Sequence, residues 1–236
     1  MKKKYLFLIP ARGGSKSIPY KNIMPLKGRS LIYYTISTAL EAKESGLDAE
    51  VCVSTDDEKI ARISRELGAK VPFMRPADIS GDEAKSITFV LHAIDFYEKA
   101  GRRFDAVLIL EPTSPLRTAA DVAGAIDLYE RAGQPSLISV YREEHLSERS
   151  FYRKKGDIGE ALSPAHNSGQ RRQESEDLYV RNGAIFMASV EFSKQTGKIF
   201  SDTPALYVMP KERSLDINTR GDAEYAEYLM GFSQKS

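Results

Sequence analysis

Three cations surround a pair of glycines near the beginning of the sequence. Gly13-Gly14 lies between Arg12 and Lys16, and Lys21-Asn22 follows a few residues later. A glycine turn lets backbone N–H groups approach phosphate oxygens, and neighbouring cations supply the further donors that a triphosphate needs. The run lacks the Gly-Lys-Ser/Thr ending of a P-loop and the spacing of a dinucleotide-binding fingerprint. It indicates either a triphosphate site of another kind or a solvated basic loop with a tight turn.

A second polar cluster has the residue types for recognising a nucleobase. The run Arg75 to Asp78 is followed, after a short loop, by Ala84-Lys85-Ser86 at the expected start of a helix. Ser86 either caps that helix and does nothing more or acts with Arg75 on a base.

A third cluster, Glu111 to Arg117, directly follows an apolar run and contains two prolines. It is either a strand-to-helix connection capped by Thr113 or Thr118, or a ligand-binding loop. Its position at the end of a strand favours the second interpretation.

Two further clusters lie in the second half of the chain. Arg171-Arg172-Gln173 forms either weak surface salt bridges with nearby acidic residues or a site for a sugar carboxylate. Asp216 and Asn218 are two apart, so on an extended segment their oxygens face the same way and can share one ion. Oxygen ligands of this kind suit Mg²⁺, although Asp216 or Thr219 could instead cap the final helix.

The elements that must position these clusters alternate along the chain. Strand-like runs alternate with helical patterns that repeat apolar residues every three or four positions. This alternation predicts an α/β, Rossmann-like fold with a mostly parallel sheet flanked by helices. The expected strands are 5–9, 49–54, 106–110 and 136–141, the expected helices are 31–46, 56–68, 86–99 and 119–132, and regular structure is expected again at 184–187, at 205–209 and in a last helix from about Asp222.

Length and composition favour a single domain over residues 1–236, with residues 142–177 as a polar lid, disordered loop or arm. The 34 Lys and Arg residues against 33 Asp and Glu give a net charge of +1, which offers no general field for nucleic acid or an anionic membrane. The apolar run 5–9 is too short for a signal peptide or a membrane span, so a cytoplasmic protein is expected. Cys52 alternates with apolar residues and is expected to be a buried structural thiol.

Together, these clusters resemble the acylneuraminate cytidylyltransferases, the CMP-sialic acid synthetase family. The resemblance covers nearly the whole chain in order and spacing, and its ARGGSK and PTSPLR elements are the most specific. It rests on IPARGGSKSIPYKN at 9–22, STDD at 54–57, RPAD at 75–78, PTSPLR at 112–117, RRQ at 171–173, RNGAIF at 181–186 and LDINT at 215–219.

The resemblance implies a nucleotidyltransferase fold and transfer of CMP from CTP to the anomeric hydroxyl of a sialic-acid-like nonulosonic acid, with release of pyrophosphate. It implies a homodimer in which the 142–177 arm completes the partner's sugar site, and it implies Mg²⁺ as cofactor, bound by Asp216 and Asn218. Arg12, Lys21 and Asp216 would be catalytic. Nucleotide binding would fall to Ala11, Arg12, Gly13, Gly14, Ser15, Lys16, Lys21, Asn22, Arg75, Ala84 and Ser86, and sugar binding to Glu111, Thr113, Ser114, Arg149, Arg172, Gln173 and Phe186.

The chain departs from the family pattern at four of these positions. Glu111 replaces a common Gln, Arg149 a common Lys, Phe186 an aromatic residue with a hydroxyl, and Asn218 the second of two aspartates. These changes leave the particular sugar and the second metal ligand open. The alternatives are a nucleotidyltransferase for another acidic sugar or for GTP, a nucleotide-sugar-dependent glycosyltransferase, and a non-catalytic nucleotide-binding module.

Overall fold

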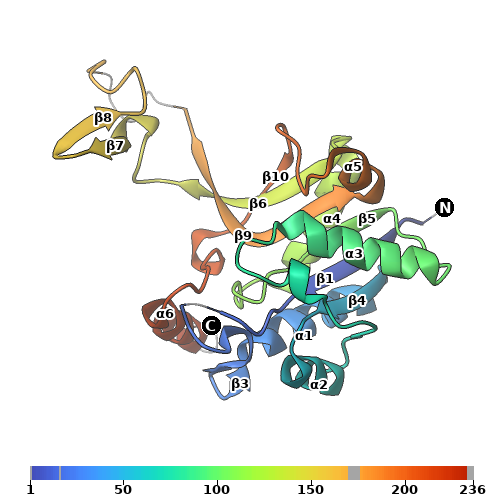
Figure 1. Ribbon diagram of the computed structural model, residues 1–236. Helices are drawn as coiled ribbons and strands as arrows, with labels where there is room; N and C mark the ends of the chain where they lie inside the picture. The colour runs from blue at the N-terminus through green and yellow to red at the C-terminus, as the bar shows by residue number, and fades with distance from the viewer. Residues whose placement is uncertain (1, 16, 170–175, 233–236) are drawn as a thin grey trace.

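A six-stranded sheet forms the centre of the computed structural model, which describes residues 2–15, 17–169 and 176–232 (Figure 1). The order is β10-β6-β9-β5-β1-β4. β9 runs antiparallel to its neighbours β5 and β6, and the other pairings in this sheet are parallel. The strands are β1 Lys4–Pro10, β4 Asp48–Ser54, β5 Ala106–Ile109, β6 Ser136–Glu143, β9 Leu178–Ser189 and β10 Ala205–Val208.

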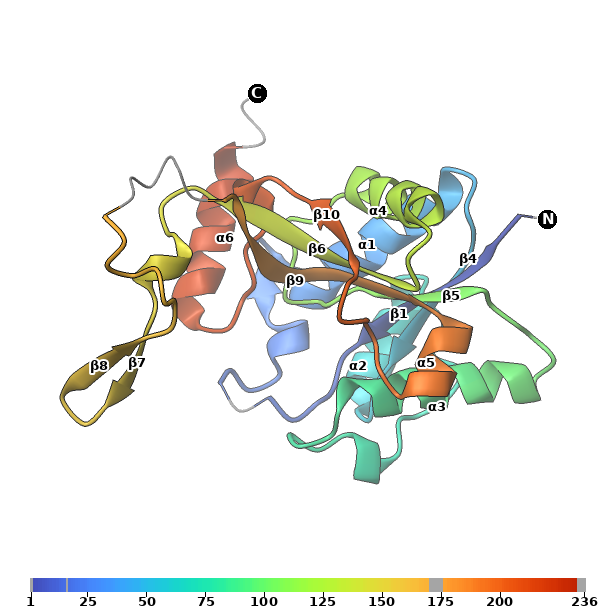
Figure 2. The same cartoon turned by 90° about the horizontal axis from the view of Figure 1, so that it is seen from above.

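Helices cover both faces of this sheet (Figure 2). Odd-numbered side chains of β1, such as Phe7, pack with α1, α2 and α4, whereas even-numbered ones, such as Leu8, pack with α3 and α5. Because successive strand residues point to opposite faces, one strand feeds two separate cores. The helices are α1 Leu31–Glu44, α2 Glu58–Glu66, α3 Ser86–Lys99, α4 Ala119–Ala132, α5 Val190–Thr196 and α6 Arg220–Phe232.

The predicted α/β architecture is confirmed, with local differences. The second helix begins at Glu58 because the side chain of Asp57 accepts a hydrogen bond from Ile60 N (2.9 Å) and acts as its N-cap. β9 starts at Leu178, six residues before the predicted segment. The hairpin of β2 Pro25–Leu26 and β3 Arg29–Ser30 and the short helix α5 were not predicted.

The described part of the predicted arm, residues 144–169, projects from the body of the protein after β6 (Figure 1). The far end of this arm is a small hairpin made of β7 Tyr152–Lys155 and β8 Ile158–Ala161. Apolar side chains on the arm are unusually exposed, and Ile158 is 75 % accessible. The arm therefore presents apolar surface that its own chain leaves in contact with solvent.

Cys52 lies fully buried in β4, as predicted for a structural thiol. Burial raises the pKa of its thiol to about 12, so it stays protonated at neutral pH. Within the described ranges, no helix is long and apolar enough to cross a membrane.

Candidate active site

The glycine turn after β1 is shaped by residues at the end of the neighbouring strand β4 and just beyond it. The backbone N–H of Gly13 donates to Asp56 Oδ1 (2.9 Å), and Ala11 N donates to Ser54 O (2.9 Å). A Cβ on Gly13 would lie 2.9 Å from the side chain of Asp57, so only glycine fits there. The STDD run at 54–57, a weak signal in the sequence, thus fixes the path of the turn.

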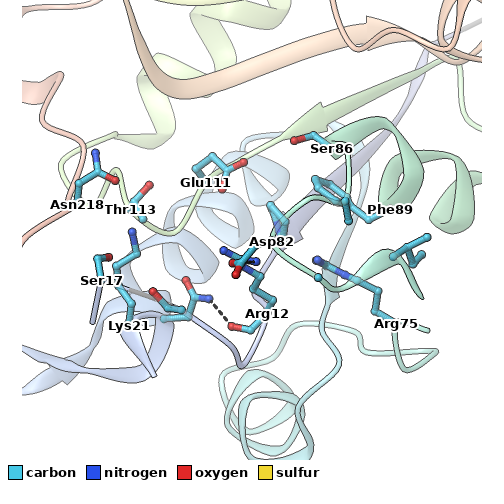
Figure 3. A pocket seen from close by; sticks show the side chains of 16 residues that line it. Arg12, Ser17, Lys21, Arg75, Asp82, Ser86, Phe89, Glu111, Thr113 and Asn218 are labelled. Atoms are coloured by element: carbon cyan, nitrogen blue, oxygen red, sulfur yellow. Dashed lines mark hydrogen bonds and ion pairs between the residues drawn. The ribbon is translucent and has the colours of Figure 1, made fainter. Parts of the chain in front are cut away.

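Asn22, which lies further along the chain, also holds the glycine turn in place. Its amide Nδ2 donates to the carbonyl of Arg12 (3.0 Å), and the side chain is only 7 % exposed (Figure 3). Asn22 therefore acts on the backbone of the turn, and this local role is independent of any ligand.

Most of the predicted nucleotide-binding residues come together around one cavity of about 490 Å³, called here the first cavity (Figure 3). Ala11, Gly13 and Gly14 shape the adjoining backbone without lining it, and Lys16 lies outside the described residues. The predicted site residues that line it are Arg12, Ser15, Lys21, Asn22, Arg75, Ala84, Ser86, Glu111, Thr113 and Asn218.

Arg75 is a buried cation at the wall of the first cavity. Its guanidinium donates to Ser54 Oγ (3.0 Å) and Ser54 O (2.6 Å) and lies 4.7 Å from the ring centroid of Phe89. Burial lowers the pKa of Arg75 to about 10, against the pull of Asp56 and Glu111, so it remains charged at neutral pH.

Ser86 is the first residue of α3, and the N-cap position belongs to Lys85. The interpretation of Ser86 as a helix cap is therefore wrong. Its side chain instead faces the first cavity near Phe89.

A second cavity of about 600 Å³ adjoins the first. The two share four lining residues, namely Lys21, Glu111, Thr113 and Asn218. The second cavity is also lined by Phe186 and Asp216, which were predicted, and by Arg181, which was not assigned a role.

Four predicted sugar-site residues are not placed at these cavities. Ser114 is 1 % exposed, and its hydroxyl has no hydrogen-bond partner among the described residues. Arg149 lies on the arm, where its guanidinium donates to Ser168 Oγ (3.2 Å). Arg172 and Gln173 lie outside the described residues.

Opposite charges meet where the two cavities join. Burial raises the pKa of Glu111 to about 7, and the negative charge of Asp216 adds to this effect. Burial lowers the pKa of Lys21, but Asp216 and Glu111 oppose that shift. The junction is thus a weakly solvated place in which charges interact more strongly than in bulk water.

The LDINT segment is tied to both neighbouring loops. Lys21 Nζ donates to Ile217 O (2.9 Å), and Ile217 N donates to Thr113 O (2.8 Å). Thr219 and Asp222 bond reciprocally, Thr219 N to Asp222 Oδ2 (2.7 Å) and Asp222 N to Thr219 Oγ1 (3.2 Å). Thr219 therefore caps α6, as one of the two alternatives for this segment predicted. Asp216 does not cap the helix and can take another role.

Asp216 and Asn218 are neighbours in space, since Asn218 Nδ2 donates to Asp216 Oδ2 (2.9 Å). In the described part of the chain, no group of three or more His, Cys, Asp or Glu side chains gathers as a metal cluster. The protein can offer one carboxylate and one amide oxygen here. Such hard oxygen donors fit Mg²⁺, which usually keeps water and takes phosphate oxygens as further ligands.

Arg117 stabilises the loop that carries Glu111, and the sequence analysis did not predict this structural role. It is 2 % exposed and donates to Ala184 O (2.6 Å), Thr35 Oγ1 (2.8 Å) and Glu111 O (3.2 Å). Its position just after two prolines gave no sign that its charge would be buried. Thr118, the next residue, caps α4 in a capping box, as one interpretation of this cluster held.

A protein-family comparison decides the class of this fold and site. The model of the cytidylyltransferase family matches residues 6–235. The chain belongs to the cytidylyltransferase family. Its site is therefore that of a nucleotidyltransferase enzyme.

Named relatives of this cytidylyltransferase span its whole length. It is 32 % identical over 233 residues to a pseudaminic acid cytidylyltransferase of Campylobacter jejuni, with 99 % of each chain covered. It is 31 % identical over 235 residues to a CMP-N,N'-diacetyllegionaminic acid synthase of Legionella pneumophila, again with 99 % of each covered. An N-acylneuraminate cytidylyltransferase of Escherichia coli is 32 % identical over 96 % of this chain and 52 % of its own.

A solved structure resembles this cytidylyltransferase in fold. CMP:2-keto-3-deoxy-manno-octonic acid synthetase complexed with CTP matches with a TM-score of 0.68 at 16 % identity, covering 98 % of this chain and 99 % of the other. At this identity the likeness concerns the fold alone. It agrees with the mostly parallel, helix-flanked sheet described above.

Proposed function

We propose that this cytidylyltransferase transfers CMP from CTP to the anomeric hydroxyl of a nonulosonic acid, an acidic nine-carbon sugar of the sialic acid type. The observation that carries the proposal is the pair of adjoining cavities with a shared wall of Lys21, Glu111, Thr113 and Asn218. A group-transfer enzyme with two substrates needs such a junction, because the attacking oxygen and the phosphorus must meet there. The relatives named for pseudaminic, legionaminic and N-acylneuraminic acids support the sugar class.

In this proposal the first cavity binds CTP. Arg12 and the glycine turn receive the phosphates. Arg75 and Ser86 line the part of the same cavity that lies away from Lys21, and we assign the base and ribose to that part (Figure 3). Arg75 is already oriented by Ser54 and Phe89, so little rotamer entropy is lost when it contacts a ligand.

The proposed reaction is an in-line attack of the sugar hydroxyl on the α-phosphorus. A new bond forms between the sugar oxygen and the α-phosphorus, the bond from the α-phosphorus to the pyrophosphate leaving group breaks, and the hydroxyl proton passes to solvent. Lys21 lies at the junction and can stabilise the charge that develops on the α-phosphate. Its bond to Ile217 O holds the ammonium group in place before the substrates arrive.

The fit of oxygen donors supports Mg²⁺ as the cofactor, with Asp216 and Asn218 as the residues that would hold it. The ion would supply charge neutralisation at the phosphate oxygens. The one protein carboxylate proposed as a ligand is Asp216, so a CTP-linked, rather than permanently bound, ion is expected.

We further propose that the arm, residues 142–177, packs against a second copy of the chain to form a homodimer. Tyr152, Ile158 and Leu162 are 56 %, 75 % and 53 % exposed, and exposed apolar side chains gathered on one projecting segment are typical of a protein–protein contact. An Ile158→Lys, Leu162→Glu double variant should become monomeric by sedimentation equilibrium. If the wild-type protein is itself monomeric at micromolar concentration, the arm has another use.

Release of pyrophosphate tests the function directly. With Mg²⁺, each of the four nucleoside triphosphates should be offered with N-acetylneuraminic, legionaminic, pseudaminic and octulosonic acids. Release with CTP and one nonulosonic acid supports the proposal and identifies the sugar. Release with GTP, or only with the octulosonic acid, would overturn the stated substrate class, and no release from folded protein would favour a binding module. A cytoplasmic location, where CTP is available, belongs to the same proposal.

A further inference from the structure

The side chains around Asp216 alternate between the second cavity and the interior of the protein. Ser214, Asp216 and Asn218 line the second cavity. Leu215 and Ile217 instead pack in a small apolar cluster with α6. This is the alternation of an extended chain, in which residues two apart point the same way. A contact that fixes Ser214 therefore also favours the direction in which Asp216 points.

Asn182 of β9 makes such a contact. Its amide Nδ2 donates to Ser214 Oγ (2.9 Å) and to Met209 Sδ (3.3 Å). Ser214 Oγ in turn donates to Pro210 O (2.8 Å). Both hydrogens of the amide are thus used on the segment that leads to Asp216.

The oxygen of the same amide is held by the sheet. Asn182 Oδ1 accepts hydrogen bonds from Ser139 Oγ (2.6 Å) and from Ala184 N (3.2 Å). These contacts lie at a bulge in β9, where the pairing with β6 shifts register. Asn182 is 4 % exposed, and its amide has all four of its hydrogen-bonding positions filled. It therefore links the sheet firmly to the segment that carries Asp216.

The next residue, Gly183, lies against the carboxylate of Asp216. A Cβ on Gly183 would be 3.9 Å from Asp216 Cγ. Gly183 adopts a φ of +75°, which glycine tolerates best. The Asn-Gly pair of the RNGAIF run thus meets the proposed metal-binding segment at two points, Ser214 and Asp216.

We propose that Asn182 is a positioning residue that holds Asp216, through Ser214, in the place where it binds Mg²⁺. Asn182 acts on the protein rather than on a substrate, because its amide is fully bonded within the chain. The inference rests on the proposed function and deepens it, since it names a residue behind the metal site. Residues that orient a metal ligand typically contribute roughly 10- to 100-fold to metal affinity or activity.

Calorimetric titration with CTP, in Mg²⁺ and in EDTA, measures the metal contribution without turnover. Mg²⁺ should tighten CTP binding by the wild type, because Asp216 and the phosphates would share the ion. Asn182→Ala should weaken binding in Mg²⁺ by roughly 10-fold and change the Kd in EDTA by less than about threefold.

A milder variant guards against loss of folding in Asn182→Ala. Ser214→Ala removes one acceptor of the Asn182 amide and should weaken CTP binding in Mg²⁺ by about fivefold, the effect of one hydrogen bond. Ser64→Ala is the matched control. It removes an equally buried serine hydroxyl, which donates to Ile60 O (2.7 Å) within α2, and should alter neither Kd.

The decisive comparison repeats Asn182→Ala and Ser214→Ala in an Asp216→Asn protein. If Asn182 acts through Asp216, neither change should lower kcat or CTP affinity in Mg²⁺ by more than about twofold once the carboxylate is gone. Losses that multiply would show a general structural role and overturn the inference. Equal weakening in Mg²⁺ and in EDTA, or unchanged CTP binding by both variants, would overturn it too.

The same titrations separate this inference from the proposed reaction. If the wild type binds CTP equally well with and without Mg²⁺, the assignment of the metal to Asp216 is wrong, and the role of Asn182 is overturned with it. If Mg²⁺ tightens CTP binding but no pyrophosphate is released, the proposed reaction alone is wrong. The binding data for the Asn182 and Ser214 variants then still decide the inference.

Discussion

Arg12 and Asp82 form an ion pair, with 2.5 Å between Nη1 and Oδ1, inside the cavity proposed for CTP (Figure 3). Arg12 belongs to the glycine turn after β1, and Asp82 to the loop before α3. The carboxylate of Asp82 therefore pairs with the guanidinium of Arg12, which is also expected to bind the triphosphate. The phosphates of CTP would compete with Asp82 for this guanidinium, and the competition would reduce the net affinity for CTP.

Asp82→Asn should tighten CTP binding. Both side chains are about one-third exposed, and such pairs are worth about 0–1 kcal/mol, so the Kd should fall by up to about fivefold. Calorimetric titration with CTP at low salt measures this, and the gain should shrink at high salt. Asp127→Asn, in an exposed pair on α4, is the control. Weaker binding by the variant would mean that Asp82 instead holds its loop in the binding conformation.

Lys21→Met should abolish most turnover while leaving the fold intact. Methionine keeps the apolar stem but removes the charge at the junction, and the loss of one group that stabilises developing charge costs roughly 10²- to 10³-fold in kcat. Pyrophosphate release and thermal melting are the two measurements. Lys59→Met, an exposed lysine near the beginning of α2, serves as a comparison. Near-normal turnover by the Lys21 variant would contradict the assigned role.

Asn218→Asp should lower the Mg²⁺ concentration needed for half-maximal activity. The change adds a second carboxylate beside Asp216, and a divalent cation gains from each negative oxygen ligand. Asp216→Asn should have the opposite effect and lower kcat as well. Magnesium titrations of pyrophosphate release decide this, and identical titration curves for all three proteins would remove both residues from the metal site.

The local pattern of the sequence predicted the fold well where strands and helices alternate. The apolar run around Phe7 and the helix that starts at Leu31 are fixed by short-range periodicity, and both appear where expected. Thr118 and Asp121 form the capping box that their three-residue spacing allows. Such features depend on neighbours in the chain, which a sequence displays directly.

Features that depend on contacts between residues far apart in the sequence were harder to predict. β9 lies between β5 and β6 and runs antiparallel to both, and no local signal in the sequence encodes either its position or its direction. Arg181 reaches the second cavity through a bulge fixed by Ser139 on another strand. Likewise, the burial of Arg117 could not be predicted from the sequence, because it depends on three hydrogen-bond acceptors that only the folded structure brings together. The motifs supplied many of the residues that line the two cavities, but long-range contacts determine which of them face those cavities.

Arg117→Met should destabilise the protein severely without touching a substrate. The change would leave Ala184 O, Glu111 O and the hydroxyl of Thr35 without their buried donor. An unsatisfied buried polar group costs about 1–3 kcal/mol, so a loss of roughly 3–5 kcal/mol in the free energy of unfolding is expected. Urea denaturation measures it. A loss below about 1 kcal/mol would show that water or a rearranged loop replaces the arginine.

The pair of Asp121 and Arg213 should make stability depend on pH in the acid range. Burial alone raises the pKa of Asp121, but hydrogen bonds from Arg213 (2.7 and 3.1 Å) and Thr118 outweigh it and hold that pKa below its usual value. A carboxyl whose pKa is lower when folded contributes stability above the pKa of the unfolded chain, about 3.9, and loses it as the pH falls through the folded value. Asp121→Asn should therefore melt well below the wild type at pH 7, and the gap should narrow below about pH 4. Thermal melting of both proteins between pH 7 and pH 3 tests whether the difference in melting temperature narrows as the pH falls. Asp127→Asn is the exposed control on the same helix. A gap that stays constant down to pH 3 would mean that Asp121 contributes by packing and capping rather than by its charge.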